Sequence, residues 1–506
     1  MQIKMAFILF LMGIPSVEAA TITVTHLNDS GVGSLRAAIT TAEMDATADT
    51  IEFGSLSGTI SLSSALPNIT RPLTITGNGN VTIAGAGVAS AFRIIHVNVP
   101  GSGPRTPITF QSLTLSDGDA LSLNQNGGAV LAEGNVSLVM TNCIFTGSFA
   151  VQGGAVAIVN NSQITLSGGR FENNTAGSST TSGNGGAIFL GDGQLTVTKV
   201  RFQRNRAFTR GGAFAMNSLD GNSTAIILTS LFLQNDAAEG GGGVSVAESG
   251  NPATLDLQRV TFFGNDGDRG GIGPSGAGGI FTLGSPDVRI RNSLLALNGK
   301  NRSGTNADSF TGGTDNCEGS MTSQGQNLSD ITDTQCHFGS SDFSAATAGI
   351  NYTASSTQIT LGSSVLLSTS QAIDQGSPAF CSSSTDLNTD IDSKASYGPC
   401  DIGAFEFGSC GDSFVQSGAG ETCDPPSATC DSSCHLIVAT GGSGGGSGGS
   451  GGSSGSGGTG GSIGSGSSGG SGGSGGSAGS GSGGTGGITP DVNPSVDSGG
   501  CQLISF

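Results

Sequence analysis

Two short acidic clusters are the first candidates for chemistry in this sequence. Asp117 and Asp119 form one cluster, and Asp266, Asp268 and Arg269 form the other. Carboxylates that bind Ca²⁺ beside an Arg or Lys base can perform lyase chemistry. An inverting glycoside hydrolase instead needs an acid and a base roughly 6.5–9.5 Å apart. Both clusters lie in glycine-rich turns, where aspartate commonly bonds the local backbone. We therefore interpret them as turn residues and predict no catalytic residue.

A third acidic segment has the spacing of a calcium-binding loop. From Asp386 to Asp392, every second residue carries a side-chain oxygen. However, Ile391 stands where such a loop needs a glycine, and Tyr397 where it needs a bidentate glutamate. The sequence therefore predicts no cofactor, and calcium at this loop is the one metal that it suggests. The histidines are scattered and indicate no triad: His26, His96, His337 and His435.

The cysteines fall into local groups near the C-terminal end. Two of the ten, Cys143 and Cys501, stand apart. For an exported chain, the spacing of the other eight predicts disulfides. Zinc is the alternative for the last four, although their Cys-x6-Cys-x3-Cys run fits a zinc ribbon poorly. The expected groups are Cys317 with Cys336, Cys381 with Cys400, and two bonds of open connectivity among Cys410, Cys423, Cys430 and Cys434.

Residues 1–19 have the organisation of a secretory signal peptide. Lys4 supplies a positive charge, and Met5–Ile14 form an apolar stretch that is too short to cross a bilayer. Small residues at Val17 and Ala19 predict cleavage after Ala19. An uncleaved N-terminal anchor is the alternative. The mature chain is therefore expected to leave the cytoplasm, where disulfides can persist.

The composition excludes several classes of partner. Lys and Arg number 18 and Asp and Glu number 37, so the formal net charge is 18 − 37 = −19. A nucleic-acid-binding protein would need a basic face to neutralise phosphates, so no nucleic-acid partner is expected. Electrostatic docking on an anionic bilayer is disfavoured for the same reason.

Two short motifs alternate through the central region. The first is Gly-Gly followed by a small and an apolar residue, and the second is Phe-x-x-Asn. Glycine pairs begin at Gly127, Gly153, Gly185, Gly211, Gly241 and Gly278. The Phe-x-x-Asn copies begin at Phe171, Phe202, Phe232 and Phe262, with imperfect copies at Phe145 and Leu295.

The spacing of these motifs predicts a stack of β-coils. The interval from Gly-Gly to the next Phe position is nearly fixed at 17–21 residues, whereas the return interval varies from 5 to 13. Apolar residues alternate within the fixed half, as in short strands. A β-propeller would need blades of about 40–50 residues, which is longer than this repeat. We therefore expect an all-β parallel β-helix, with the Phe rings in one inward row, the Asn side chains stacked at one corner, and Gly-Gly at a corner that needs positive φ.

Resemblances extend this prediction. The alternating motifs resemble the repeats of chlamydial polymorphic outer-membrane proteins and related bacterial right-handed parallel β-helices. Residues 33–39, Gly-Ser-Leu-Arg-Ala-Ala-Ile, are similar to an N-terminal signature of secreted bacterial β-helix proteins. This implies that Leu35–Glu43 form a helix that caps the first coil. Together these resemblances assign residues 20–370 to the β-helix.

The C-terminal part resembles two smaller modules. Ala372–Pro378 and Cys400–Glu406 resemble the choice-of-anchor module that closes many bacterial surface β-helices, which places it at residues 371–408. Asp390–Lys394 replace an arginine-containing run of that family. Residues 409–436 resemble a shortened cysteine-rich repeat of myxobacterial surface proteins.

The end of the chain reads as a tether. Residues 437–496 are mostly Gly, Ser and Thr, which predicts a flexible, disordered linker. Residues 497–506 resemble the start of a bacterial C-terminal sorting signal, in which Cys501 is the candidate anchor. The membrane span and arginine cluster of such signals are missing, so a plain free thiol is the alternative.

These observations predict a non-enzymatic protein, secreted or held at the cell surface (outer membrane or extracellular), with an adhesive or structural role. Its ligand would be an unknown surface or a polysaccharide, and only a C-terminal anchor would attach it to a membrane. The alternative is an extracellular polysaccharide lyase or glycoside hydrolase on the same scaffold. The chain has no Trp and 2 Tyr, which disfavours the aromatic platforms of sugar-cleaving grooves.

Overall fold

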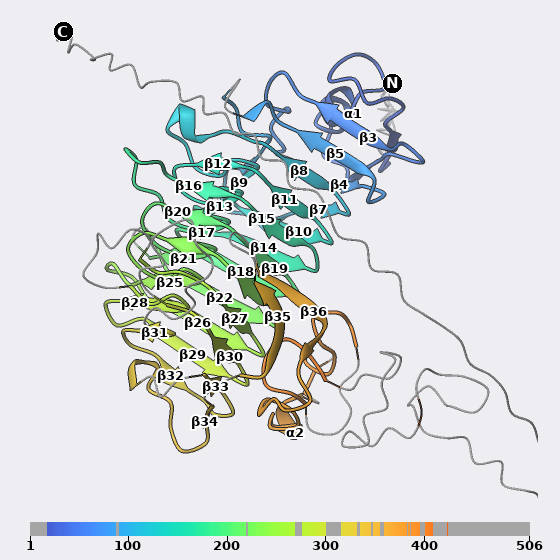
Figure 1. The fold of residues 1–506 in the computed structure, drawn as a ribbon. Coiled ribbons are helices and arrows are strands. Elements are labelled where there is room, and N and C mark those ends of the chain that lie inside the picture. The colour runs from blue at the N-terminus through green and yellow to red at the C-terminus, as the bar shows by residue number, and fades with distance from the viewer. Residues whose placement is uncertain are drawn as a thin grey trace, which may run out of the picture. The chain divides into compact units, whose positions relative to one another are not determined.

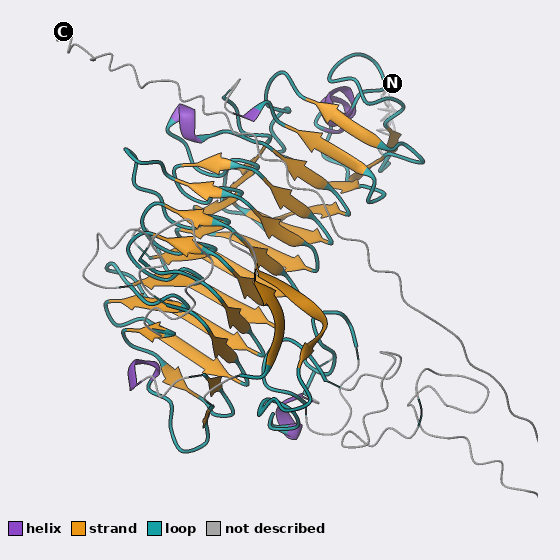
Figure 2. Cartoon of the chain, in the orientation of Figure 1, coloured by secondary structure: helices purple, strands orange, loops and turns teal. Residues whose placement is uncertain are grey.

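The computed structural model describes 18–87, 91–218, 221–268, 276–299, 315–330, 334–345, 348–354, 359–381, 383–384, 386–394, 400–407 and 423. The expected disulfide partners Cys410, Cys430 and Cys434, the candidate anchor Cys501 and the Gly/Ser linker lie outside these residues. In Figures 1 and 2, short strands follow one another in stacked layers, with few helices.

The strands form three long parallel sheets and one short one. Sheet A contains β1 (Thr21–Thr23), β2 (Asp49–Glu52), β4 (Leu73–Thr76), β7 (Thr106–Gln111), β10 (Val136–Thr141), β14 (Ser162–Ser167), β18 (Gly193–Thr198), β22 (Ser223–Leu228), β26 (Ala253–Gln258), β29 (Asp287–Arg291) and β32 (Thr322–Ser323). Sheet B contains β3 (Gly58–Ser61), β5 (Val81–Ala84), β8 (Thr114–Ser116), β11 (Ile144–Thr146), β15 (Arg170–Glu172), β19 (Arg201–Gln203), β23 (Leu231–Leu233), β27 (Thr261–Phe263), β30 (Leu294–Ala296), β33 (Leu328–Ser329) and β34 (Phe343–Ser344).

Sheet C closes each coil, and sheet D adds a short strand at one corner. Sheet C contains β6 (Ile95–Val99), β9 (Val130–Gly134), β13 (Val156–Val159), β17 (Ile188–Leu190), β21 (Phe214–Asn217), β25 (Val244–Ala247), β28 (Ile280–Leu283) and β31 (Cys317–Glu318). Sheet D contains β12 (Phe149–Ala150), β16 (Thr175–Ala176), β20 (Arg206–Ala207) and β24 (Asp236–Ala237). Strands of successive coils pair in parallel, which confirms the predicted right-handed parallel β-helix.

Helix α1 (Leu35–Ala42) covers the first coil, as predicted. The Ser34 side chain caps it by accepting a hydrogen bond from the Ala37 N–H at 3.2 Å. Leu35 and Ile39 are buried in the same apolar core as the strands. The helix therefore shields the open end of the β-helix, where unpaired strand edges would otherwise be exposed.

The phenylalanines of the repeat form one inward stack, which confirms the predicted row. The neighbouring rings lie 4.6–5.2 Å apart, centroid to centroid, with interplanar angles of 11–16°. Each ring is at most 1% exposed. The stack consists of Phe145, Phe171, Phe202, Phe232 and Phe262.

Truncating the middle of this stack should destabilise the β-helix strongly. We expect Phe202→Ala to lower the free energy of unfolding by about 3–5 kcal/mol, because the ring is buried between neighbours that cannot collapse into the cavity. Denaturant unfolding followed by circular dichroism measures this loss. Phe149→Ala removes a half-buried ring and is the control with a smaller expected effect. Equal losses in both variants would contradict the packing argument.

The repeated asparagines form the predicted stack at one corner. Along the buried column, each Nδ2 donates to the Oδ1 of the next asparagine at 2.8–3.0 Å. Each Nδ2 also donates to a backbone carbonyl of the preceding coil, as Asn205 does to Phe171 O at 2.9 Å. The column consists of Asn174, Asn205, Asn235, Asn265, Asn298 and Asn316.

The Gly-Gly pairs serve two purposes just before the strands of sheet C. The first glycine has positive φ in five of the six pairs, as predicted, between +60° at Gly153 and +67° at Gly185, but not at Gly278. A Cβ on the second glycine would lie 2.2 Å from the Gly186 carbonyl oxygen at Gly154, and 2.1 Å from the Gly212 oxygen at Gly186. The second position therefore needs glycine because successive coils approach closely there.

The parallel stack ends at β34, and residues 345–407 form a separate C-terminal module. It begins with an antiparallel hairpin of β35 (Ile350–Ala354) and β36 (Ile359–Leu366), followed by α2 (Pro378–Cys381). The hairpin lies inside the range that the sequence assigned to the β-helix, and neither repeat motif occurs there. In Figure 1 the module (orange) lies alongside β27 and β30 rather than continuing the stack.

The module covers an apolar strip on the outer face of sheet B. The buried residues Leu231, Phe263 and Leu294 form one hydrophobic cluster with module residues Ile402 and Phe405. Tyr352 of the hairpin contacts the Phe263 ring edge-on at 5.1 Å between centroids. In the earlier strands β11 and β15 the flanking positions are not buried, so the covered strip is confined to the later coils.

Two of the expected disulfide bonds are present in the described part of the chain. Cys317 of β31 bonds to Cys336 of the short helix η3 (Thr334–Cys336), with 4.9 Å between Cα atoms. Cys381 bonds to Cys400 within the module, with 6.0 Å between Cα atoms. Cys423 is also disulfide-bonded. Cys143 is a free, buried thiol whose pKa is raised by burial to about 11, so it is unreactive near neutral pH.

Candidate functional site

The two acidic clusters lie between strands of sheets B and C, where Asp119 and Asp266 form isolated parallel β-bridges, and they are far apart. Asp119 accepts hydrogen bonds from the N–H and the hydroxyl of Ser122, which lies in the short helix η2 (Leu121–Leu123). Asp266 accepts from the Asp268 N–H at 3.2 Å, and Arg269 lies outside the described residues. The clusters follow β8 and β27, which are five strands apart in sheet B, or about 24 Å. They cannot act together as an acid and a base.

The carboxylates of the calcium-like segment bind protein partners. Asp390 accepts backbone N–H bonds from Asp392 at 2.9 Å and Lys394 at 2.7 Å. Asp392 forms an ion pair with Arg201 of β19. Within the described ranges, no group of three or more His, Cys, Asp or Glu side chains could hold a metal ion. The segment fixes the module to sheet B.

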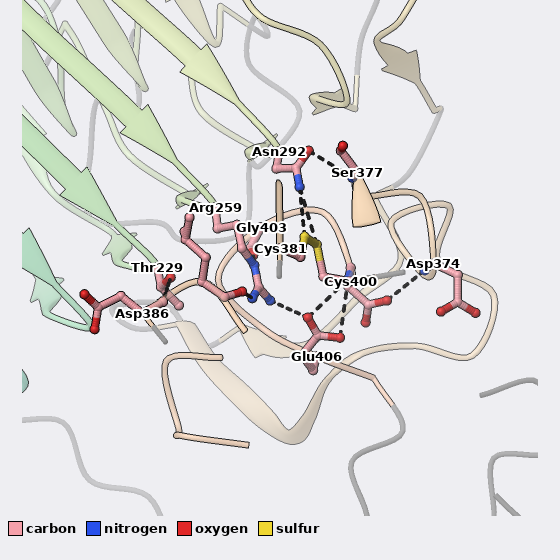
Figure 3. Close-up of a disulfide and its surroundings, with 12 residues drawn as sticks. Thr229, Arg259, Asn292, Asp374, Ser377, Cys381, Asp386, Cys400, Gly403 and Glu406 are labelled. Atoms are coloured by element: carbon pink, nitrogen blue, oxygen red, sulfur yellow. Dashed lines mark hydrogen bonds and ion pairs between the residues drawn. A yellow bond between two sulfur atoms is a disulfide. The ribbon is translucent and has the colours of Figure 1, made fainter. Parts of the chain in front are cut away.

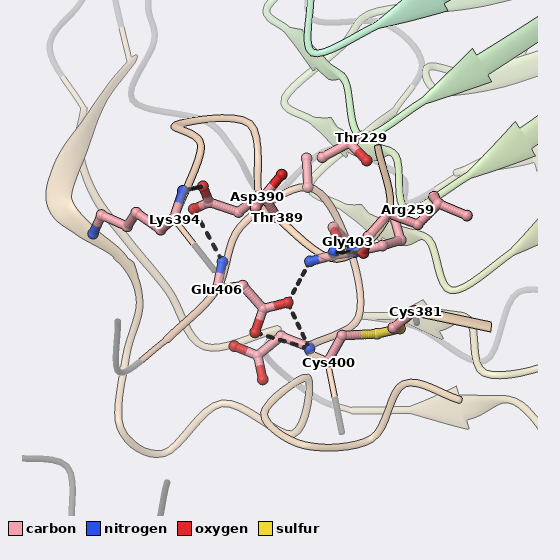
Figure 4. A network of polar contacts seen from close by, with 12 residues as sticks. Thr229, Arg259, Cys381, Thr389, Asp390, Lys394, Cys400, Gly403 and Glu406 are labelled. Atoms are coloured by element: carbon pink, nitrogen blue, oxygen red, sulfur yellow. Dashed lines mark hydrogen bonds and ion pairs between the residues drawn. A yellow bond between two sulfur atoms is a disulfide. The ribbon is translucent and has the colours of Figure 1, made fainter. Parts of the chain in front are cut away.

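A buried arginine is the centre of the contact between the module and the β-helix (Figures 3 and 4). Arg259 follows β26 and is fully buried. Its Nη2 pairs with the Glu406 carboxylate, its Nη1 donates to Leu387 O, and its Nε donates to Gly403 O at 3.3 Å. All three partners belong to the module. The ion pair is desolvated, since the side chains are 0% and 4% exposed.

A second buried carboxyl lies beside this pair. The Asp401 N–H donates to the Glu406 carboxylate at 3.2 Å, while the Asp401 side chain accepts from the Asp374 N–H at 2.8 Å and from Phe407. Burial raises the pKa of Asp401 well above its usual value, and the nearby Glu406 carboxylate raises it further. Glu406 is the carboxylate that faces Arg259, and its charge disfavours ionisation of Asp401.

This raised pKa gives the module a defined pH dependence. Between the ordinary carboxyl range, near pH 4, and the raised value, folded Asp401 binds more protons than unfolded Asp401. Its contribution to stability is therefore fully present at acid pH and is lost as pH rises through the raised pKa. We expect Asp401→Asn to flatten this decline. Thermal unfolding across the pH range measures it, and an unchanged slope would contradict the assignment.

The module disulfide touches the β-helix directly. Asn292 of the turn after β29 donates from Nδ2 to Cys381 Sγ at 3.3 Å and to Cys400 Sγ at 3.4 Å (Figure 3). The Gly403 N–H donates to Asn292 O at 2.8 Å, and the Gly376 N–H donates to Cys400 O at 2.8 Å. The disulfide thus fixes the module segments that contact the coil.

A polar hollow lies on the outer face of sheet C, near its N-terminal end. It encloses about 360 Å³ and is lined by Arg93, His96, Asn124, Gln125, Asn126, Leu131, Glu133 and Val159. His96 Nε2 and Glu133 Oε1 form a hydrogen bond at 2.8 Å. Asn160 Nδ2 donates to the other Glu133 oxygen at 3.4 Å.

A second hollow of about 400 Å³ lies next to the first, since its lining residue Asn160 donates to Glu133 of the first hollow. It is lined by Gly101, Ser102, Gly103, Gly134, Asn135, Asn160 and Asn161. We call the two hollows together the polar furrow. Sequence reasoning missed it because His96 and Glu133 stand 37 residues apart on successive coils. Of the other histidines, His26 contacts Val32 O at 2.9 Å and His435 lies outside the described residues.

Comparison with known proteins supports the fold class. The coils define a right-handed parallel β-helix protein. A family model described as a right-handed β-helix region matches residues 95–295, which include the Phe stack and most of the Asn column. A search of curated proteins finds no significant match. No helix in the described ranges is long and apolar enough to cross a membrane.

Proposed function

We propose that this chain is a non-enzymatic β-helix protein with an adhesive or structural role. The observation that supports the proposal is the continuity of the Phe stack and the Asn column inside the β-helix. Stacked Phe rings and bonded Asn side chains hold the coils in register, which produces a rigid scaffold with long outer faces. Such faces suit repeated contacts with a surface or a polysaccharide.

The outer face of sheet A illustrates such a surface. Side chains on successive strands lie in register there, as the pairing of Thr74 with Thr109 and of Thr165 with Thr196 indicates. Strand neighbours are about 4.8 Å apart, so these hydroxyls form an uncharged row that Val139 interrupts between Thr109 and Thr165. The row continues through Thr21 and Thr50 at the N-terminal end. A face of this kind favours extended contact rather than enclosure of a substrate.

We also propose that the protein is exported and retained at the cell surface. The signal-like residues 1–19, the disulfides, the Gly/Ser linker and Cys501 support this location. In this proposal the choice-of-anchor-like segment 371–408 and the cysteine-rich segment 409–436 belong to the surface-protein types that they resemble. The linker separates the β-helix from its attachment point.

The polar furrow favours one alternative, an extracellular polysaccharide lyase or glycoside hydrolase. It brings a carboxylate, an imidazole and a guanidinium together, on Glu133, His96 and Arg93. Such groups can transfer protons or stabilise charge. However, among the described residues Glu133 is the only carboxylate that lines the furrow, whereas most glycoside hydrolases use two.

One experiment separates the two functions. The purified mature chain is incubated with a panel of neutral and acidic polysaccharides, and both retention on the polymer and new chain ends are measured. We expect retention on at least one polymer without new reducing or unsaturated ends. Cleavage that disappears in Glu133→Gln would establish the enzymatic alternative and overturn our proposal.

A further inference from the structure

The polar furrow has side chains that are fixed before any ligand arrives. Arg93 Nε donates to Asn126 O at 3.1 Å and Gly127 O at 3.0 Å, and its Nη2 donates to Gln125 Oε1 at 3.2 Å. The His96–Glu133 pair is partly shielded, with side chains 23% and 22% exposed. Because these side chains are already ordered, a ligand would lose little additional side-chain entropy on binding them.

The furrow also has an apolar surface between its polar groups. Leu131 lies beside His96 in the parallel register of β6 and β9, and Val159 lies beside Glu133 in the register of β9 and β13. In Figure 1, β9 and β13 are neighbouring teal strands of sheet C. An apolar surface flanked by a few oriented polar groups is the usual composition of a small-molecule site.

The second hollow is formed by strained backbone. Asn160 and Asn161 are consecutive non-glycine residues with φ of +55° and +61°. Their N–H groups donate to the two Asp192 carboxylate oxygens at 2.5 and 2.8 Å, which holds this conformation. Backbone strain of this kind clusters at ligand-binding segments. A Cβ at Gly134 would lie 2.3 Å from Val99 O, so the wall of the hollow needs glycine there.

The charges of the furrow favour an uncharged ligand. Glu133 and Arg93 carry opposite charges, so a ligand of either sign would be attracted by one and repelled by the other. Hydroxyl groups, in contrast, can donate to the Glu133 carboxylate and accept from the amide and guanidinium groups. The C–H face of a pyranose ring fits the apolar surface of Leu131 and Val159.

We propose that the polar furrow binds a neutral oligosaccharide, with one sugar unit in each hollow. The inference deepens the adhesive function proposed above, since it assigns that function a ligand class and a site. Asn160 lines the second hollow and bonds to Glu133 of the first, which places it between the two sugar units.

The test is calorimetric titration of the mature chain with neutral oligosaccharides of glucose, galactose, mannose or N-acetylglucosamine, and with oligogalacturonate as the acidic comparison. We expect one neutral series to bind and Glu133→Ala to weaken it about tenfold or more, because hydrogen bonds to a charged group are lost. Leu131→Trp, which fills the hollow without removing a polar group, should also weaken binding.

Glu172→Ala is the matched control, since Glu172 pairs with Arg204 on sheet B, away from the furrow. Its affinity should equal that of the parent chain, and thermal unfolding should show that all variants fold. The inference is overturned if no neutral oligosaccharide binds, if only oligogalacturonate binds, or if neither furrow variant weakens binding. Cleavage of a bound neutral oligosaccharide would contradict the non-enzymatic function and leave the binding site in place.

Discussion

Replacing Arg259 by methionine should release the C-terminal module from sheet B. The substitution leaves the Glu406 carboxylate buried without its cation, and the carbonyls of Leu387 and Gly403 lose a donor. Breaking one partner of a buried ion pair costs about 3–5 kcal/mol. The β-helix core lies on the other side of sheet B and should stay folded. Limited proteolysis should therefore cleave the module first while the coils resist.

Two further variants make this prediction specific. Arg201→Met removes a partly exposed ion pair with Asp392 and should cost at most about 1 kcal/mol. The double variant Arg259→Met with Glu406→Leu removes both charges and should recover most of the loss, because a buried pair can be replaced by apolar groups at little cost. Protease resistance of Arg259→Met equal to that of the parent would show that apolar packing alone holds the module.

The sequence predicted the features that depend on the repeat itself. The spacing of Phe-x-x-Asn placed Phe202 inward and Asn205 at a corner. This works because local residues set the length of each strand, and stacking repeats the same positions from coil to coil. The prediction that the Gly-Gly pairs need positive φ explains only their first residue, such as Gly153. The second residue, such as Gly154, must be glycine because the next coil approaches it closely. The cap helix also depends on a local signal, the Ser34 N-cap.

The module contact could not be predicted in the same way. Arg259 reaches Gly403 across 144 residues, and no repeated pattern connects them. One local signal was available, however. β23 reads Leu-Phe-Leu and β27 reads Thr-Phe-Phe, with all three residues of each strand buried, whereas β15 reads Arg-Phe-Glu. A strand that is apolar on both faces must be covered on both, so the loss of alternation marks the docking strip.

Replacing an asparagine in the middle of the buried column should destabilise the β-helix by about 3–6 kcal/mol, summed over the groups left unpaired. In Asn235→Ala, the N–H and Nδ2 of Asn205 lose the acceptor that bonds both at 3.0 Å. Phe202 O loses the Asn235 Nδ2 donor at 3.0 Å. These groups are buried, and the surrounding coils leave no path for water to replace the bonds.

The variant Asn235→Asp distinguishes the effect of losing hydrogen-bond donors from the effect of losing side-chain volume. Aspartate keeps the shape and the acceptor oxygens of the side chain, but it cannot supply the two Nδ2 donors to Phe202 O and Asn265 Oδ1. We therefore expect Asn235→Asp to lose stability comparable to Asn235→Ala in denaturant unfolding, while Asn80→Ala, at an exposed turn, stays within about 0.5 kcal/mol of the parent. Near-parental stability of Asn235→Asp would mean that packing, not the donor bonds, holds this corner. A large loss in both variants would instead show that the asparagine column keeps successive coils in register. Each side chain of the column bonds the coils on both sides.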